Sequence, residues 1–215
     1  MFRTRAILLF FALLLSLSWL STSGLWKRVK TRLSCNEPVK DLSAKKISDK
    51  LSLKAAEAKY FVKKKEYNGE ICFLVDMSMS SGKNRFFVYN LTTDSIVLSG
   101  LVAHGSCDAG FQISPTFSNT VNSGCSSLGR YKIGNAYQGT FGLAYKLYGL
   151  DSLNNNALKR TIVLHSYACV PEQETDPEPI CNSRGCPMIS PGFLQQLKLF
   201  IEQSKKPVLL WIFEK

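Results

Sequence analysis

Two cysteines, Cys181 and Cys186, lie in the segment CNSRGCPMISP, and the step from Ser183 to Gly185 leads directly into the second. A cysteine of ordinary pKa is only a few per cent thiolate at neutral pH, so a nucleophilic cysteine needs a neighbouring base or positive charge. Cys186 could therefore be half of a disulfide, a metal ligand or an attacking thiolate. The rest of the sequence must distinguish these three roles.

The chain contains two histidines, His104 and His165. His165 ends the apolar run TIVLH, at a strand-to-loop exit where a side chain can face a cleft. The polar segment 166–184 could fold away as a lobe and return Cys186 to the neighbourhood of His165. The imidazole could then serve as general base and acid for the thiol.

Acyl transfer through a thioester also needs backbone N–H groups aimed at the developing negative charge. Gly185 has no Cβ and lets the chain approach a substrate carbonyl closely. Because Pro187 has no N–H, the expected donors are the amides of Cys186, Gly185 and Arg184. The charge of Arg184 would also favour the thiolate.

The elements that must position these groups are mostly β. Runs of β-branched and aliphatic residues predict strands, and Ser190-Pro191 is typical of a helix start. The expected elements are a helix over 41–67, a strand over 71–77, a hairpin over 84–90 and 95–104, a loop-like stretch over 105–137, a strand over 160–167, a helix from Ser190 to about 204 and a strand over 207–213.

Composition describes a folded globular protein, with 215 residues of which 45% are hydrophobic and 20% charged. The net charge of +11 is concentrated in residues 25–70, which hold 13 basic and 6 acidic side chains, or +7. No pattern typical of DNA or RNA binding accompanies this charge, so we expect no nucleic-acid partner. The basic stretch is either a solvated lysine-rich helix or a surface for anionic lipid or cell-wall polymer.

The first 24 residues resemble a secretory signal, with Arg3 and Arg5 before the apolar run 6–20. That run is short for a membrane span, which needs about 20 residues. It predicts either a cleaved signal or a membrane attachment through residues 6–20, and both imply export. We divide the chain into this segment, a basic helical segment over 25–69 and a catalytic domain over 70–215.

Export changes the interpretation of the seven cysteines, because disulfides form in oxidising compartments. An odd number predicts one free, reactive thiol. Cys169 and Cys181 flank the polar lobe, and we expect a disulfide between them.

The ordered pair of His165 and S-R-G-C-P at 183–187 resembles the L,D-transpeptidase catalytic domain (YkuD-like) family, in the branch where proline follows the cysteine. The resemblance covers roughly residues 71–213. Its further pieces are His104-Gly105, FSNTVNSGCSSLGRY at 117–131 and YGLDSLNNNALKRTIVLH at 148–165.

The resemblance implies a mostly β (α+β) fold, a β-sandwich or barrel with a few peripheral helices. Such enzymes cleave the stem peptide of peptidoglycan after its third residue, commonly diaminopimelate, and release D-Ala. The enzyme thioester then passes the acyl group to an amine, whereas water as acceptor gives an L,D-carboxypeptidase. Cys186 would be the nucleophile and His165 the general base and acid. From the residues themselves we expect Ser183 and Tyr167 to contact substrate, and His104 either to line the substrate pocket or to be structural. Either a backbone carbonyl or the Ser183 hydroxyl could orient His165. The resemblance implies no metal or organic cofactor, and we expect a monomer in the periplasm or cell envelope.

Some positions depart from the family's pattern. Ser166 stands where this branch usually has glycine, and Arg184 where the wider family often has histidine. The Arg that commonly follows the nucleophile closely is absent, so these accessory roles are not transferred. Arg160 could bind a substrate carboxylate, but strand alternation favours a structural ion pair.

Three other interpretations of Cys186 stay open. His165, Cys169, Cys181 and Cys186 form an H-x3-C-x11-C-x4-C pattern that could hold zinc. Cys186 could instead pair with Cys181 in a disulfide. The chain could also be a wall-binding protein without catalysis.

Overall fold

The computed structural model describes residues 37–215, with side chains from residue 44 onward. The predicted export segment 1–24, its apolar run 6–20 and Cys35 lie outside the described residues. Residues 51–215 form one compact unit, which holds the sheet and the site described below. Within the described residues, none of the helices combines the length and the apolar character that crossing a membrane requires.

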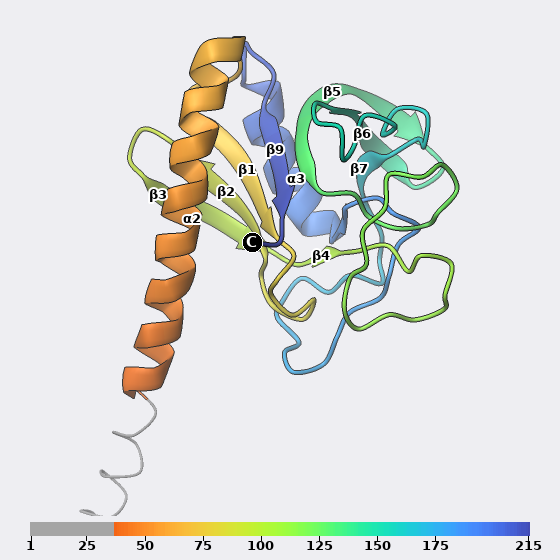
Figure 1. Ribbon diagram of the computed structural model, residues 1–215, viewed down its shortest axis with the longest axis horizontal. Coiled ribbons are helices and arrows are strands. Elements are labelled where there is room, and N and C mark those ends of the chain that lie inside the picture. The colour runs from red at the N-terminus through yellow and green to blue at the C-terminus, as the bar shows by residue number, and fades with distance from the viewer. Residues whose placement is uncertain (1–36) are drawn as a thin grey trace, which may run out of the picture. The chain divides into compact units, whose positions relative to one another are not determined.

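In the described residues, nine strands form one sheet in the order β3-β2-β1-β9-β5-β6-β7-β8-β4 (Figure 1). Neighbours are antiparallel except for the parallel pairs β1–β9 and β7–β8. The strands are β1 (Ile71–Asp76), β2 (Phe86–Asn90), β3 (Ser95–Gly100), β4 (Val102–Ala103), β5 (Gly129–Gly139), β6 (Gly142–Gly149), β7 (Val163–Ser166), β8 (Met188–Ile189) and β9 (Leu209–Phe213).

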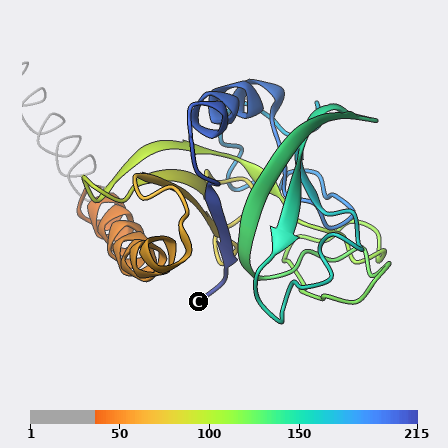
Figure 2. The same cartoon turned by 90° about the horizontal axis from the view of Figure 1, so that it is seen from above.

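The sheet curls back on itself. Its two edge strands, β3 and β4, are consecutive along the chain and are separated only by Leu101. The two edges must therefore approach each other. Figure 2 shows the strong curvature of the long strand β5, drawn in green. The predicted mostly β fold of the sandwich or barrel type, with few helices, is confirmed.

Helix α3 (Pro191–Glu202) covers one face of this sheet. Ser190 is its N-cap and accepts a hydrogen bond from the Phe193 N–H, while Pro191 occupies the first turn, as the sequence predicted. Phe193 packs edge-to-face on Phe86 with ring centroids 5.3 Å apart, and it fills the space above Gly100. The helix ends at Glu202, two residues before the predicted end.

Helix α2 (Glu37–Lys65) covers the opposite face with its C-terminal half. The residues from Leu51 onward bury an apolar stripe at helical spacing, and Lys54 lies over the rings of Trp211 and Phe213. Asn68 then ends the helical region, because its side-chain oxygen accepts from the backbone N–H groups of Glu70 and Ile71. Figure 2 shows α2 in orange and α3 in blue on opposite sides of the strands. The predicted helix over 41–67 is confirmed, with bounds shifted toward the N-terminus.

The prediction of a loop over 105–137 is wrong at the C-terminal end of that range. Strand β5 begins at Gly129, and β6 pairs with it to form a hairpin that the sequence did not indicate. The density of Gly, Ser and Asn in this region concealed a period-2 pattern, in which Gly129, Tyr131 and Ile133 are buried and their neighbours partly exposed.

Replacing Phe193 with Ala should lower the free energy of unfolding by about 3–5 kcal/mol, because the lost ring leaves a cavity between α3 and the sheet. Leu199→Ala on the exposed side of the same helix is the matched control and should change it by less than about 1 kcal/mol. Denaturant unfolding of both variants measures the difference. Equal losses would contradict this packing.

Candidate active site

Cys186 reaches the site through the pairing of β8 with β7. Met188 lies opposite His165 in this parallel pair, and continuing the register back by two residues places Cys186 beside Val163. The Cys186 sulfur accordingly lies 3.9 Å from the Thr161 carbonyl oxygen. Val163 and His165 share one face of β7, and Cys186 and His165 both line the cavities described below.

A tight turn presents the sulfur. The Ser183 hydroxyl accepts from the Gly185 N–H at 3.2 Å and donates to the Cys186 carbonyl at 2.6 Å. Ser183 was predicted to contact substrate. Its hydroxyl here holds the turn, although the residue also lines the cavity described below.

Both the backbone conformation and the close packing at position 185 require a glycine there. Its φ of +108° is in the region that side-chain-bearing residues rarely adopt. A Cβ at this position would lie 2.6 Å from the Cys125 carbonyl oxygen. The turn can therefore pack against Cys125 only because residue 185 has no side chain.

Arg160 fixes that carbonyl. Its guanidinium donates to four oxygens: the carbonyls of Ser118 and Cys125 and the hydroxyls of Ser123 and Ser127. The ion pairs among the described residues do not include Arg160, so the predicted structural ion pair is wrong. Arg160 instead holds the loop segment 118–127 against the turn that carries Cys186. Its positive charge also lowers the pKa of the Cys186 thiol, against the larger raising effect of burial.

His165 is 6% exposed at the end of β7. Its Nδ1 lies 3.2 Å from the Ser166 carbonyl oxygen, which can only accept, so Nδ1 carries the proton and Nε2 keeps its lone pair. The ring stacks on Phe141, with centroids 5.2 Å apart and planes at 21°. Burial lowers the pKa of His165, and the contact with Ser166 acts in the opposite direction.

The pKa of the Cys186 thiol is raised by burial, against the smaller opposing effects of the Val163 N–H and the Arg160 charge. Burial therefore keeps both the thiol and the imidazole neutral near pH 7. The hydrogen bonds of the described residues do not include one between the two side chains. Catalytic hydrogen bonds often tighten only when substrate is present.

Two cavities meet at these side chains. The first has a volume of about 500 Å³ and the second about 270 Å³, and both are lined by Phe141, His165, Arg184 and Cys186. The first also has Phe111, Tyr167 and Met188 in its walls. Tyr167, a predicted substrate contact, is 48% exposed and packs edge-to-face on Phe141. Cys186 thus lines both cavities.

The expected oxyanion donors differ in their availability. The Gly185 N–H is engaged by the Ser183 hydroxyl. In the part of the chain that the structure describes, the hydrogen bonds leave the backbone N–H groups of Arg184 and Cys186 without an acceptor. These two amides remain the groups that could receive negative charge.

The prediction that His104 contacts substrate is not supported, because its ring is fully buried. Its Nδ1 lies 2.9 Å from the guanidinium of Arg85, and the Asn182 side chain lies 3.3 Å from its Nε2. Burial, reinforced by the Arg85 charge, lowers the pKa of His104 to about 4. His104 is a neutral structural group behind the site.

The predicted disulfide between Cys169 and Cys181 is present and closes the polar lobe. It removes two ligands from the proposed zinc pattern and leaves Cys181 unavailable to Cys186. No cluster of potential metal ligands occurs among the described residues. The zinc and Cys181–Cys186 interpretations are therefore wrong.

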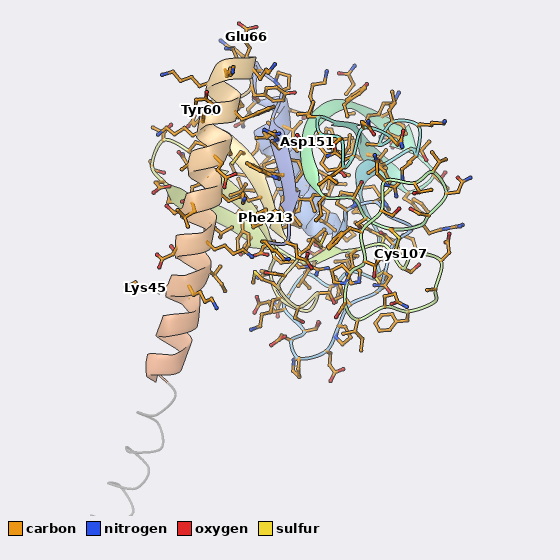
Figure 3. The ribbon with its side chains drawn as sticks, viewed as in Figure 1. Lys45, Tyr60, Glu66, Cys107, Asp151 and Phe213 are labelled. Carbon is orange, nitrogen blue, oxygen red and sulfur yellow. A yellow bond between two sulfur atoms is a disulfide. The ribbon has the colours of Figure 1, made fainter. Side chains whose placement is uncertain are left out.

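A second disulfide, Cys107–Cys125, ties the long loop after β4, where Figure 3 labels Cys107. The expectation of one free thiol is also wrong, since Cys72 and Cys186 are both unpaired in the described residues. Cys72 is fully buried in β1, and burial raises its pKa to about 12. Cys186 is only half-buried and lines both cavities, so it is the accessible one of the two.

Comparison with known proteins identifies the family. The model of the L,D-transpeptidase catalytic domain family matches residues 43–212, most of the chain. The chain belongs to this family. No curated protein sequence matches the chain.

Solved structures with a similar arrangement include the avibactam carbamoyl enzyme of Ldtfm, with 13% identity and a TM-score of 0.42, covering 68% of this chain and 49% of that one. The helical cell shape determining protein Pgp2 from Campylobacter jejuni has 14% identity and a TM-score of 0.44, with 68% and 48% covered. An L,D-transpeptidase from Xylanimonas cellulosilytica has 11% identity and a TM-score of 0.40, with 67% and 60% covered. The chain spans about half the length of the first two.

The sequence did not indicate Phe141 as a site residue. It is 56% exposed at the tip of the β5–β6 hairpin, and Gly139 pairs with Gly142 around it. An aromatic residue in a two-residue turn between glycines was the available signal, because a turn is an unusual place for a large apolar side chain.

Replacing His104 with Gln should remove much of the protein's acid sensitivity. The folded pKa of about 4 lies below the ordinary 6.5, so the unfolded chain binds the proton more readily. The contribution of His104 to wild-type stability should thus fall by up to about 3 kcal/mol as the pH drops from about 6.5 to about 4 and level off below that. Denaturant unfolding across this range measures the slope.

His165→Gln is the control. Its free energy of unfolding should still decrease with falling pH by the amount that His104 contributes. A wild-type slope in the His104→Gln variant would show that another group is responsible.

Proposed function

We propose that the chain is an exported L,D-transpeptidase that acts on peptidoglycan stem peptides through a Cys186 thioester. The sulfur attacks the carbonyl carbon of the third stem residue, and His165 takes the thiol proton as the new S–C bond forms. The amide C–N bond breaks, and the same proton passes from His165 to the leaving amine of D-Ala. The backbone N–H groups of Arg184 and Cys186 stabilise the negative charge on the carbonyl oxygen between these events.

The second half of the reaction reverses these roles. An acceptor amine attacks the thioester while His165 removes one of its protons, an amide bond forms, and the S–C bond breaks. The sulfur leaves as a thiolate and takes the proton back from His165. The two cavities that Cys186 lines could receive the acyl group and the acceptor separately.

One observation carries the proposal. Cys186 is the accessible unpaired thiol of the described residues, and it shares two cavities with an imidazole whose Nε2 is free to accept a proton. A binding protein without catalysis has no need of this pair. The two disulfides are consistent with an oxidising compartment, which supports export.

Cys186→Ala should abolish release of D-Ala from a stem tetrapeptide, by at least about a thousand-fold, because no other group can form the thioester. His165→Gln should slow release by at least about a hundred-fold through loss of proton transfer. Chromatography of the products, with and without an acceptor amine, measures both the loss and the choice between transfer and hydrolysis.

Cys72→Ala is the matched control and should release D-Ala at the wild-type rate, since that thiol is buried away from both cavities. Undiminished release by Cys186→Ala would refute the mechanism. A product that is always the free tripeptide would assign the enzyme as an L,D-carboxypeptidase instead.

Alkylation of Cys186 by iodoacetamide should accelerate steadily from about pH 6 to about pH 9. Burial raises the pKa of this thiol above its ordinary value, so the reactive thiolate fraction keeps growing with pH in this range. Peptide mapping separates Cys186 from Cys72. A rate that is already high and constant near pH 6 would show a resting thiolate–imidazolium pair, contrary to the structure.

A further inference from the structure

A groove of about 640 Å³ lies between helix α2 and the strands β5 and β9, and it shares no lining residue with the two cavities around Cys186. We call it the α2 groove. Its main lining residues are Tyr60, Phe61, Lys64 and Lys65 of α2, Arg130 of β5 and Trp211 of β9. The four helix residues share one face, because they are spaced by one, three and four positions. The groove thus belongs to the basic helix, for which the mechanism gives no role.

The α2 groove carries positive charge that the protein does not balance. Its one carboxylate, Glu57, pairs with Lys54 at 3.1 Å and is therefore already neutralised. Lys64 and Lys65 are exposed, and neither takes part in the ion pairs of residues 44–215. Their two ammonium groups remain for an anionic ligand.

Arg130 adds hydrogen-bond donors to the groove. Its guanidinium lies 4.5 Å from the centroid of the Phe61 ring and 5.4 Å from that of Trp211, so the two rings hold it in place. Its Nε and Nη2 donate to Asp151, and the hydrogen bonds of the described side chains leave Nη1 without an acceptor. Since the side chain is 31% exposed, Nη1 presents its N–H groups to a ligand from a fixed position.

The aromatic side chains of the groove favour a polymer strand over a membrane. Phe61 and Trp211 are only partly exposed and lie against the Arg130 guanidinium, so neither ring is free to enter a lipid bilayer. Of the three rings in the lining, Tyr60 alone is largely exposed, at 72%, and it offers an apolar face and a hydroxyl to a sugar. A carbohydrate polymer that bears carboxylates matches this combination of a ring and cations.

The α2 groove is remote from the nucleophile. In the sheet order, β5 and β6 lie between β9 and β7, the strand of His165. Arg130 lies at the start of β5, whereas Phe141 lies beyond its far end, ~30 Å away along the strand. A ligand in the groove therefore contacts a different part of the polymer from the peptide at Cys186.

We propose that the α2 groove binds a peptidoglycan strand through carboxylates of stem peptides other than the one at Cys186. This inference rests on the proposed function and adds an anchoring site to it. Lys64, Lys65 and the Arg130 Nη1 receive the carboxylates, and Tyr60 packs on the sugar chain. Because a second contact raises the effective concentration of neighbouring stems at the active site, it favours polymeric over free substrate.

Co-sedimentation of the full chain with insoluble peptidoglycan tests this site without requiring catalysis. We expect Lys64→Gln/Lys65→Gln to weaken binding by about 3- to 10-fold, because two exposed charge pairs are lost. Wild-type binding should also weaken in high salt and on peptidoglycan whose carboxylates have been converted to carboxamides. The double variant should release D-Ala from a soluble stem tetrapeptide at the wild-type rate.

Lys59→Gln/Lys63→Gln is the matched control. It removes two charges from exposed positions of the same helix that do not line the groove, so binding should stay within about 2-fold of the wild type. Equal losses in the two double variants, or undiminished binding to the carboxamide polymer, would overturn the site.

Two further outcomes separate the alternatives. If Lys64→Gln/Lys65→Gln lost binding to anionic phospholipid vesicles but kept its binding to peptidoglycan, the groove would be a membrane surface and the proposal would be wrong. A wild type that binds peptidoglycan through the groove but releases no D-Ala from either substrate would support the anchoring site and count against the proposed function.

Discussion

The close contact between Gly185 and the Cys125 carbonyl is the constraint on which the site depends. Arg160 holds that carbonyl in place, and the left-handed conformation of Gly185 lets the chain pass against it. The following residue, Cys186, is thereby directed toward β7, where it lines two cavities together with His165. A side chain at residue 185 would separate the turn from the loop and displace the sulfur from both cavities.

Burial determines the protonation states of Cys186 and His165. It raises the pKa of the Cys186 thiol and lowers the pKa of His165, so both are neutral at rest. Such a neutral pair fits the proposed mechanism, in which His165 takes the thiol proton as the sulfur attacks. The stacked Phe141 ring helps to shield the imidazole, which links the β5–β6 hairpin to the chemistry.

The sequence predicted the parts of this structure that local patterns determine. The apolar runs of β1, β7 and β9 and the Ser190-Pro191 helix start appeared at nearly the right residues. The β5–β6 hairpin was missed because glycines and polar residues interrupt its alternation. The pairing of His165 with the cysteine turn could be anticipated from their order along the chain. The four contacts of Arg160 and the Cys107–Cys125 disulfide could not, because they join segments whose approach only the folded sheet determines.

Trapping of the acyl-enzyme tests the central claim most directly. The protein is mixed with a stem tetrapeptide, quenched in acid within the first turnovers and digested for mass spectrometry. We expect a mass increase equal to the tripeptide acyl group, located on Cys186 and lost on treatment with hydroxylamine. An unmodified Cys186 under conditions in which D-Ala is released would contradict it.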